Sequence, residues 1–294
     1  YFRRSRKLYK SYLGYCHPKY ASALRQHAEL VRQLGRYPEA RKLLVCALRI
    51  IATTLGKQHP DYALCLNDLA VHYHWAADYK RAKQYYLRAL AVYEALAKPS
   101  RDYFDLLINL SGLYLRQQDY DRAETLARQA LEMARQFGED TMAFALGLSS
   151  LAEVYNERGD HKQNQTLLRQ AISLLEKLNG IEHLSLVSIL GNLALSLRAT
   201  GDYRSSEEYL RRALAILRVH LPPEHLDNAS ILERLGDHYY LIRDFEQAAR
   251  YYQDVLAIQR HVLGEKHPWV AKTWDNVGSL YAEQQDYNRA LECL

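Results

Sequence analysis

HPDYALCLNDLAVHYHWAADYKRAKQYYLRALAVYEALA, residues 59–97, contains the pattern that decides the fold. Its apolar residues recur at offsets of three, four and seven, which is the spacing of a helix face and not of a strand. Pro60 suits the first turn of a helix, where its missing N–H is not needed, so we expect a helix over about 61–76. Asp78 is placed to cap a second helix over about 79–95. The segment therefore predicts two helices joined by a short turn.

The same unit recurs every 41 or 42 residues along the chain. Fixed self-similarity of this kind indicates stacked supersecondary units that bury a continuous core between neighbours. The residue that opens the second helix of each unit is Tyr37, Tyr79, Tyr120, His161, Tyr203, Phe245 or Tyr287. We expect about seven repeats, over residues 15–56, 57–97, 98–138, 139–180, 181–222, 223–264 and an incomplete 265–294, with 1–13 ending a preceding helix.

Two columns in the first helix of each unit repeat with the same regularity. A large apolar residue is followed by a small one, which lets helix backbones approach closely. The large column is Leu69, Leu110, Leu151, Leu193, Leu235 and Val277, and the small column is Ala28, Ala70, Ser111, Ala152, Ala194, Gly236 and Gly278. The fourth unit departs most from the pattern, with His161 and Asn164 in place of an aromatic residue and an alanine. We expect weaker packing of its second helix.

This succession of large, small and aromatic columns around a short turn resembles the tetratricopeptide repeat over nearly the whole chain. The usual repeat has about 34 residues, so the longer period adds roughly one turn to each helix. The connecting phrase at residues 263–268, LGEKHP, resembles the kinesin light chain type of repeat. Residues 59–70 are similar to repeats of large bacterial multidomain proteins. The resemblance implies an all-α, right-handed superhelical solenoid of antiparallel helix pairs.

Composition and motifs point away from chemistry within the chain. The net charge is +5 and the basic residues are dispersed, which is weak evidence for nucleic acid. No phosphate-binding glycine loop and no catalytic motif occurs, so we expect no enzymatic activity, no cofactor and no metal site. His17, His59 and His267 sit in the linkers, where helix capping accounts for them. The four cysteines have neither metal-ligand nor paired spacing, which favours buried thiols in a cytoplasmic protein. No stretch approaches the roughly 20 apolar residues that span a bilayer, so we expect no membrane partner.

The resemblance also implies where a partner would bind. In tetratricopeptide arrays the first helix of each pair lines a concave groove, and the residue before the large column points into it. Here that position is polar in every unit: Gln26, Asp68, Asn109, Ser150, Asn192, Arg234 and Asn276, which we call the polar ladder. Such residues can hydrogen-bond a peptide backbone, and the alternative is that they form solvated helix faces. Arg198, Trp75 and Tyr240 are further candidates, and the two aromatic residues are either anchors or packed between repeats.

These features favour a protein-interaction scaffold that holds a peptide or partner domain, as the sensing or regulatory part of a longer protein. A second hypothesis fuses the array to an effector, such as a caspase-like CHAT peptidase outside this segment. A third is cargo linkage of the kinesin light chain kind, and a fourth is nucleic-acid binding. The lysine, asparagine and arginine clamp of chaperone-binding members is not found in register.

Overall fold

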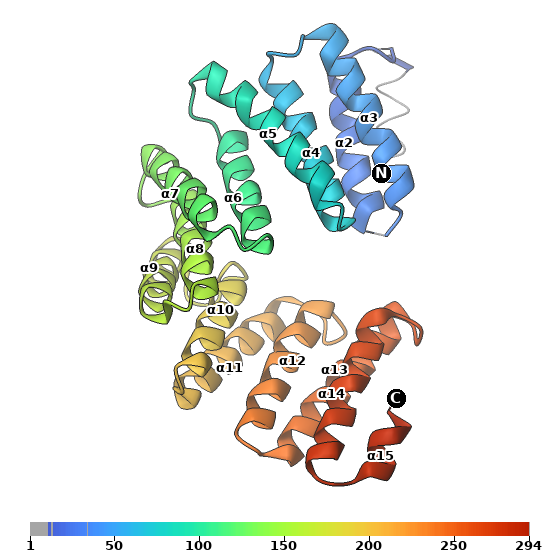
Figure 1. Ribbon diagram of the computed structural model, residues 1–294, viewed down its shortest axis with the longest axis vertical. Coiled ribbons are helices and arrows are strands. Elements are labelled where there is room, and N and C mark those ends of the chain that lie inside the picture. The colour runs from blue at the N-terminus through green and yellow to red at the C-terminus, as the bar shows by residue number, and fades with distance from the viewer. Residues whose placement is uncertain (1–10, 13, 34, 294) are drawn as a thin grey trace. The chain divides into compact units, whose positions relative to one another are not determined.

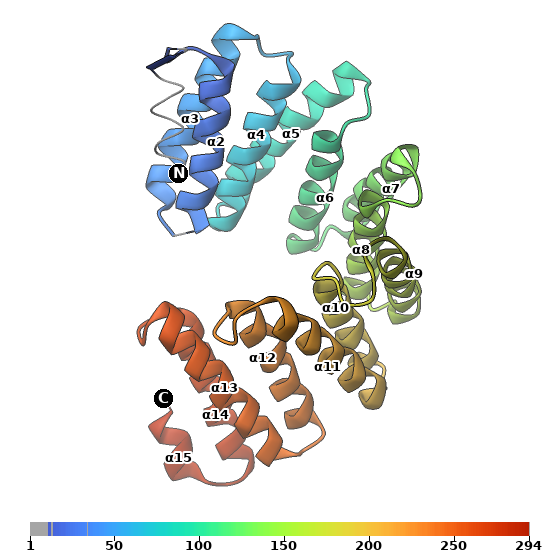
Figure 2. The same cartoon turned by 180° about the vertical axis from the view of Figure 1, so that it is seen from behind.

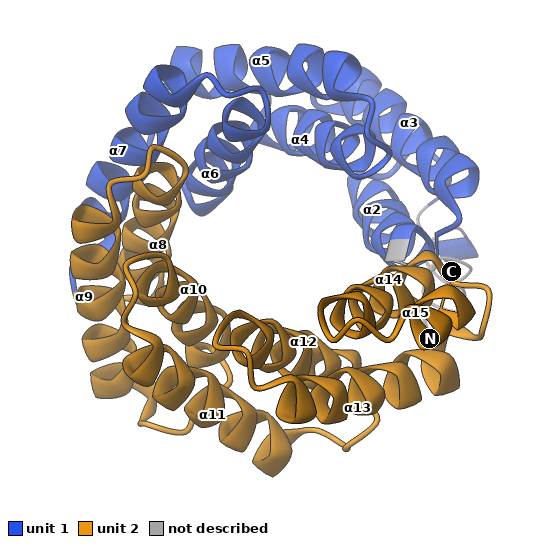
Figure 3. Ribbon diagram, turned by 60° about the horizontal axis from the view of Figure 1, so that its bottom comes forward, with its two compact units in different colours: residues 1–139 blue, residues 140–294 orange. Residues whose placement is uncertain are grey.

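A computed structural model describes residues 11–12, 14–33 and 35–293, and within these residues every regular element is a helix (Figure 1). Most of residues 1–13, where we expected the end of a preceding helix, lie outside the described part. The chain divides into two compact units, residues 1–139 and 140–294, which Figure 3 colours separately. The first unit holds α2 (Pro18–Gln33), α3 (Tyr37–Thr54), α4 (Pro60–Trp75), α5 (Tyr79–Leu96), α6 (Arg101–Arg116) and α7 (Tyr120–Phe137).

Successive helices form antiparallel pairs in both units, as Figures 1 and 2 show. Within each unit the even-numbered helices form one layer and the odd-numbered helices form the other. The all-helical fold predicted from the repeat pattern is therefore confirmed. The second unit holds α8 (Met142–Glu157), α9 (His161–Asn179), α10 (Leu186–Ala199), α11 (Tyr203–His220), α12 (Leu226–Leu241), α13 (Phe245–Leu263), α14 (Pro268–Glu283) and α15 (Tyr287–Glu292).

Local side chains fix where the helices begin. The predicted cap at Asp78 is confirmed, since its carboxylate accepts a hydrogen bond of 3.1 Å from the backbone N–H of Arg81. Linker histidines cap α2, α4, α12 and α14 in the same way. Nδ1 of His59 accepts from the N–H of Asp61 at 3.1 Å, and this satisfies one of the amides that a helix start leaves without a partner. Equivalent carboxylate caps are formed by Asp119, Asp160, Asp202, Asp244 and Asp286, and equivalent histidine caps by His17, His225 and His267.

A left-handed residue ends every even-numbered helix from α2 to α14. Gly159 and Gly201 adopt φ values of 78° and 82°. A residue without a Cβ takes this conformation with little strain. In four repeats a residue other than glycine has a positive φ at the equivalent position. These residues are Ala77, Gln118, Arg243 and Gln285. The turn is thus set by the repeat geometry even where glycine is missing.

The core lies between the two layers of each unit. Leu69, Leu110, Leu193 and Leu235 of the large column are completely buried, and Leu151 and Val277 are at most 5% exposed. Burial of this much aliphatic surface is the main source of stability for such a fold.

Polar residues in the small columns are accommodated by one recurring hydrogen bond between paired helices. The Ser111 hydroxyl donates to the Ala123 carbonyl at 2.9 Å, and the Ser206 hydroxyl donates to the Ala194 carbonyl at 2.8 Å. Asn164, which replaces an alanine in the fourth repeat, donates from Nδ2 to the Ala152 carbonyl at 2.7 Å. Since buried polar groups cost free energy unless they are bonded, these contacts explain how the two hydroxyls and the Nδ2 group fit here, whereas Oδ1 of Asn164 is buried without a hydrogen-bond partner among the described residues. Weaker packing of α9 stays a prediction.

Candidate functional site

The polar ladder places one residue on each even-numbered helix, at the same position in every repeat. Gln26 is exposed, and Asp68, Asn109, Ser150, Asn192, Arg234 and Asn276 are half-buried. Each side chain is therefore accessible from the even-numbered layer of its own unit.

An open cleft of about 560 Å³ lies between α2 and α4 in the first unit, lined among others by Arg25, Gln26 and Asp68. Nε of Arg25 donates to Oδ2 of Asp68, so this ladder carboxylate is already paired with the neighbouring helix. Burial raises the pKa of Asp68, and Arg25 opposes that rise. In the same unit, Nδ2 of Asn109 on α6 donates to Oδ1 of Asn67 on α4 at 3.4 Å. Neighbouring even-numbered helices are thus bridged by polar pairs along this layer.

The two aromatic candidates differ in their surroundings. Trp75 is 65% exposed at the end of α4, and the Arg32 guanidinium lies 5.1 Å from the centre of its ring. Tyr240 is half-buried, with its ring centre 6.0 Å from that of Phe245 on the next helix. Trp75 therefore offers free aromatic surface, whereas Tyr240 is partly used in packing α12 against α13.

A second cleft of about 430 Å³ lies in the second unit between α10, the end of α11, and α12. Arg234 of the polar ladder lines it, together with Gly191 of α10. Nη1 of Arg234 is buried and has no hydrogen-bond acceptor. Burial, and then repulsion from Arg198, lower the pKa of Arg234 below its ordinary value. The structure thereby brings the charge of Arg198 close to Arg234, where Asp237 and Glu233 act on the pKa of Arg234 in the opposite direction.

A larger cleft of about 690 Å³ was missed by the sequence reasoning, which looked only at the first helix of each pair. Its wall is mainly apolar, with Leu214 and Leu221 of the α11 side, Leu232 of α12, and Ala257 and Ile258 of α13. The sequence does mark this place as unusual. The linker LPPEH at residues 221–225 differs from the LG-x-x-HP linkers that end at Pro60 and Pro268.

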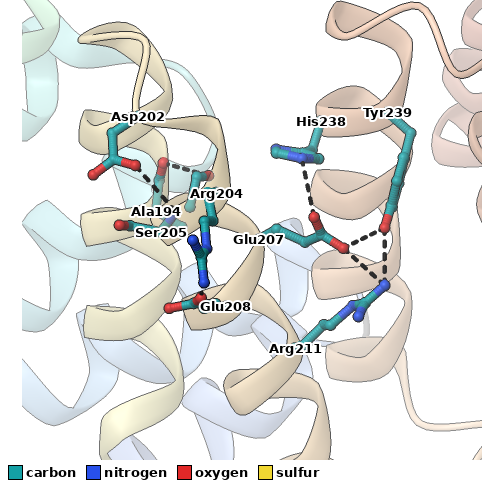
Figure 4. Close-up of polar contacts among 10 residues, drawn as sticks. Ala194, Asp202, Arg204, Ser205, Glu207, Glu208, Arg211, His238 and Tyr239 are labelled. Carbon is teal, nitrogen blue, oxygen red and sulfur yellow. Dashed lines mark hydrogen bonds and ion pairs between the residues drawn. The ribbon is translucent and has the colours of Figure 1, made fainter.

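Figure 4 shows a polar cluster that joins α11 to α12. The hydroxyl of Tyr239 donates to Oε1 of Glu207, which also pairs with Nη2 of Arg211 at 2.7 Å. Nη2 of Arg211 donates to Oη of Tyr239 at 3.0 Å, and Nε2 of His238 lies 3.9 Å from Oε2 of Glu207. Burial raises the pKa of Tyr239 to about 12 and lowers that of His238. Tyr239, Glu207 and Arg211 satisfy one another, whereas Nδ1 of His238 is buried without a hydrogen-bond partner among the described residues. We interpret the cluster as a structural link between the helices.

Residues able to carry chemistry are scattered. In the described part of the chain, no three or more histidine, cysteine, aspartate or glutamate side chains gather as metal ligands would. The expectation of buried thiols is wrong for Cys16 and Cys46, which are exposed at positions outside the core columns. Cys65 is buried, and burial raises its pKa to about 12. None of the described helices is long and apolar enough to cross a membrane.

The comparison with family models matches the tetratricopeptide repeat over residues 19–95, 73–136, 141–218 and 227–294. No curated protein matches the sequence. Among solved structures, BtubC (BKLC) from P. vanneervenii is 23% identical with a TM-score of 0.61, over 74% of this chain and 86% of that one.

Two further solved structures have the same fold over 99% of this chain. They are the apo quorum sensor NprR from B. thuringiensis, 14% identical over 78% of its chain with a TM-score of 0.73, and a Rap protein complexed with Competence and Sporulation Factor, 15% identical over 82% of its chain with a TM-score of 0.68. These identities support a common fold, and the family model matches most of the sequence. The chain belongs to the tetratricopeptide repeat family.

Proposed function

We propose that the chain is a protein-interaction scaffold that binds a peptide or partner domain on its even-numbered helices. The observation that carries this proposal is the polar ladder: a half-buried or exposed polar side chain at the same position of each even-numbered helix, beside open clefts in both units. Amide side chains spaced along an array can donate to and accept from a peptide backbone without reading its sequence. Exposed Trp75 adds an aromatic anchor of the kind that dominates many interfaces.

The test begins with selection of binding peptides from a displayed random library on the intact chain. The variants Asn109→Ala, in the first unit, and Asn192→Ala with Asn276→Ala, in the second, are then measured by fluorescence anisotropy. We expect the variant of the unit that holds the peptide to lose affinity by about two- to twelvefold for each lost hydrogen bond, because each contributes about 0.5–1.5 kcal/mol. Unchanged affinity in both variants rules out the groove.

A matched control removes three amides from the odd-numbered layer. Gln129, Gln170 and Gln253 are exposed on α7, α9 and α13. Their simultaneous replacement by alanine is expected to leave peptide affinity and helical circular dichroism unchanged. Loss of affinity in this control would place binding on the other layer.

We infer further that the array is the sensing or regulatory part of a larger cytoplasmic protein. A signal transduction ATPase from Pyrococcus horikoshii with a tetratricopeptide sensor supports this role, since this chain covers only 41% of it, at 14% identity and a TM-score of 0.65. The reading frame beyond Leu294 is the test. An effector domain, such as a CHAT peptidase with its histidine and cysteine, supports the role, whereas further repeats and a stop codon would leave an adaptor.

A further inference from the structure

The cleft of about 690 Å³ in the second unit lies where one repeat lacks a large side chain. The residue seven positions before the large column has a ring or a branched aliphatic side chain in every unit but one. These residues are Tyr62, Tyr103, Phe144, Leu186, Asn228 and Val270. Tyr62, Leu186 and Val270 are at most 6% exposed, so this position normally fills space in the interior. Asn228 is the exception, and it lines the cleft.

Asn228 leaves this space open because its amide is held by the linker before α12. Nδ2 of Asn228 donates to the carbonyl of Pro222 at 2.8 Å and to the carbonyl of Pro223 at 3.3 Å. These two acceptors fix the orientation of the amide, since the reversed amide would set its oxygen against two carbonyls. The side chain is 2% exposed, and its Oδ1 has no hydrogen-bond partner among the described residues. The amide is therefore committed to the linker and does not replace a ring.

The second repeat shows which side chain occupies the equivalent place. There the hydroxyl of Tyr62 accepts a hydrogen bond of 3.0 Å from Nη2 of Arg88 on α5. Arg88 is the tenth residue of α5, and Asp254 is the tenth residue of α13. Asn228 and Asp254 line the same cleft, as this register requires. A tyrosine ring in the cleft would accordingly direct its hydroxyl toward Asp254.

The walls of the cleft match the surroundings of that ring. Ala257 and Ile258 line the cleft from α13, at the positions that Ala91 and Val92 occupy in α5. Leucines of α11 and α12 complete the apolar surface. An aromatic ring gains free energy from burial against such a wall, and a phenol keeps a polar tip for one hydrogen bond.

The rim of the cleft supplies the partner for that hydrogen bond. Asp254 is exposed, and among the residues that the structure describes it has neither an ion-pair nor a hydrogen-bond partner. Arg218, Glu224 and His261 also line the cleft, so the rim has both signs of charge and does not select a ligand by net charge. A phenolic hydroxyl that donates to a carboxylate forms a charge-assisted hydrogen bond. Tyr62 accepts from Arg88, whereas a ring beside Asp254 would donate.

We propose that this cleft binds the side chain of a tyrosine from a partner peptide, with its ring against Leu232 and Ile258 and its hydroxyl donating to Asp254. The volume exceeds that of a single ring, which leaves space for the residues beside the tyrosine and favours a peptide as its source. The site is formed mainly by α11 and α13 of the odd-numbered layer (Figure 3), so it goes beyond the binding proposed for the even-numbered helices.

The test uses three fluorescein-labelled peptides of the form GSALXLASG, with tyrosine, phenylalanine or alanine at the position X. Fluorescence anisotropy measures their affinity for the intact chain. We expect the tyrosine peptide to bind at least about tenfold more tightly than the alanine peptide, because the ring is buried. We expect it to bind about threefold more tightly than the phenylalanine peptide, because only the hydroxyl reaches the carboxylate.

Four variants examine the cleft itself. N228Y supplies the ring that the second repeat has at this position, and A257W fills the cleft from the exposed face of α13 without touching the linker. Both are expected to abolish binding of the tyrosine peptide while helical circular dichroism is retained. D254A is expected to lower the affinity of the tyrosine peptide to that of the phenylalanine peptide. E246A removes an equal charge from the first turn of α13 and is expected to change neither affinity.

Equal binding of the three peptides, or binding that survives both N228Y and A257W, overturns the inference. The peptide source is wrong if N-acetyltyrosinamide displaces the labelled tyrosine peptide as effectively as the unlabelled peptide does. The variant with Asn192→Ala and Asn276→Ala keeps this site separate from the polar ladder, and it is expected to bind the tyrosine peptide normally. If that variant loses the peptide while N228Y and A257W retain it, the tyrosine site fails and the proposed function stands.

Discussion

Gly236 shows how a single residue of the small column fits one particular partner. A Cβ at this position would lie 2.6 Å from Cε1 of Tyr252, whose ring is almost completely buried against α12. The Tyr252 hydroxyl also donates to Asp237 at 2.9 Å, so the ring cannot withdraw without losing a hydrogen bond. In this repeat glycine leaves room for the Tyr252 ring, whereas the second repeat combines Ala70 with Tyr86, the equivalent buried ring.

We therefore expect Gly236→Ala to lower the free energy of unfolding of the second unit by about 1–3 kcal/mol, the usual cost of overpacking. This loss outweighs the roughly 1 kcal/mol by which alanine is the better helix former. Urea denaturation followed by circular dichroism measures the change. Gly112→Ala on α6 is the control, because a Cβ there meets nothing within 4 Å, and it is expected to stabilise the chain by about 0.5–1 kcal/mol. A Gly236→Ala protein as stable as the parent contradicts the steric account.

His238 couples the stability of the second unit to pH. It is 1% exposed and faces Glu207 and Arg211 of α11, Arg198 of α10, and the rings of Tyr203 and Tyr239. Burial is the main cause of its lowered pKa, and the two arginines lower it further while Glu207 opposes them. Since the unfolded pKa is about 6.5, the unfolded chain takes up a proton first as the pH falls. The stability provided by neutral His238 is thus complete above about pH 6.5 and is lost below it.

The expected result is a free energy of unfolding that falls between pH 7 and pH 5, by at most about 1.4 kcal/mol per pH unit from this residue. His238→Leu should reduce that slope, and leucine occupies the equivalent buried positions Leu113 and Leu280. Denaturation curves at several pH values compare the slopes rather than the absolute stabilities. Identical slopes for parent and variant would show that His238 does not titrate differently on folding.

The turn between an even-numbered helix and the odd-numbered helix that follows it contains a residue with positive φ in every described repeat. Gly35, Gly159 and Gly201 take positive φ there without strain, whereas Gln118 adopts φ of 59° at the same position after α6. A residue with a Cβ is disfavoured in this conformation by roughly 1–2 kcal/mol relative to its ordinary conformations. Part of the stability of α6 and α7 is therefore lost at Gln118.

Gln118→Gly is expected to stabilise the first unit by about 1 kcal/mol, because it removes the left-handed strain at a small cost in chain entropy. The reciprocal change, Gly201→Gln, should destabilise the second unit by a similar amount. Both are measured by urea denaturation. If neither variant shifts the midpoint, the turn is not under strain at these positions.

The helices themselves could be predicted from the sequence because their determinants are local. The first helix of the quoted unit was expected over about 61–76 and is α4, Pro60–Trp75, and the second was expected over about 79–95 and is α5, Tyr79–Leu96. His59, Pro60 and Asp78 act within a few residues of their own position. Column spacing likewise identified the buried leucines, since a helix face is a property of one segment.

The clefts could not be predicted, because they depend on pairs of side chains from different helices. The ladder position of Arg234 was evident, but its burial against Gly191 requires the separation of α10 and α12. The Arg25–Asp68 pair and the fit of Tyr252 against Gly236 depend in the same way on neighbouring repeats. A glycine inside the helical pattern at residue 191 was the one available signal of a close approach.

At the scale of the whole molecule, the chain consists of two compact units, and the second begins at Asp140. That unit has its own buried large column in Leu151, Leu193, Leu235 and Val277. In repeat arrays stability is approximately a sum of contributions within repeats and between adjacent repeats. The second unit should therefore retain most of its fold without residues 1–139.

A polypeptide of residues 140–294 is accordingly expected to have the helical circular dichroism of a folded protein and a cooperative urea transition. Because Gly236 and Tyr252 lie inside this unit, Gly236→Ala should destabilise the polypeptide by the same amount as the full chain, to within about 0.5 kcal/mol. Agreement between the two values shows that the energetics of the Tyr252 contact are contained in the second unit. A polypeptide without a cooperative transition, or a variant effect confined to the full chain, would show instead that residues 1–139 are required for the second unit to fold.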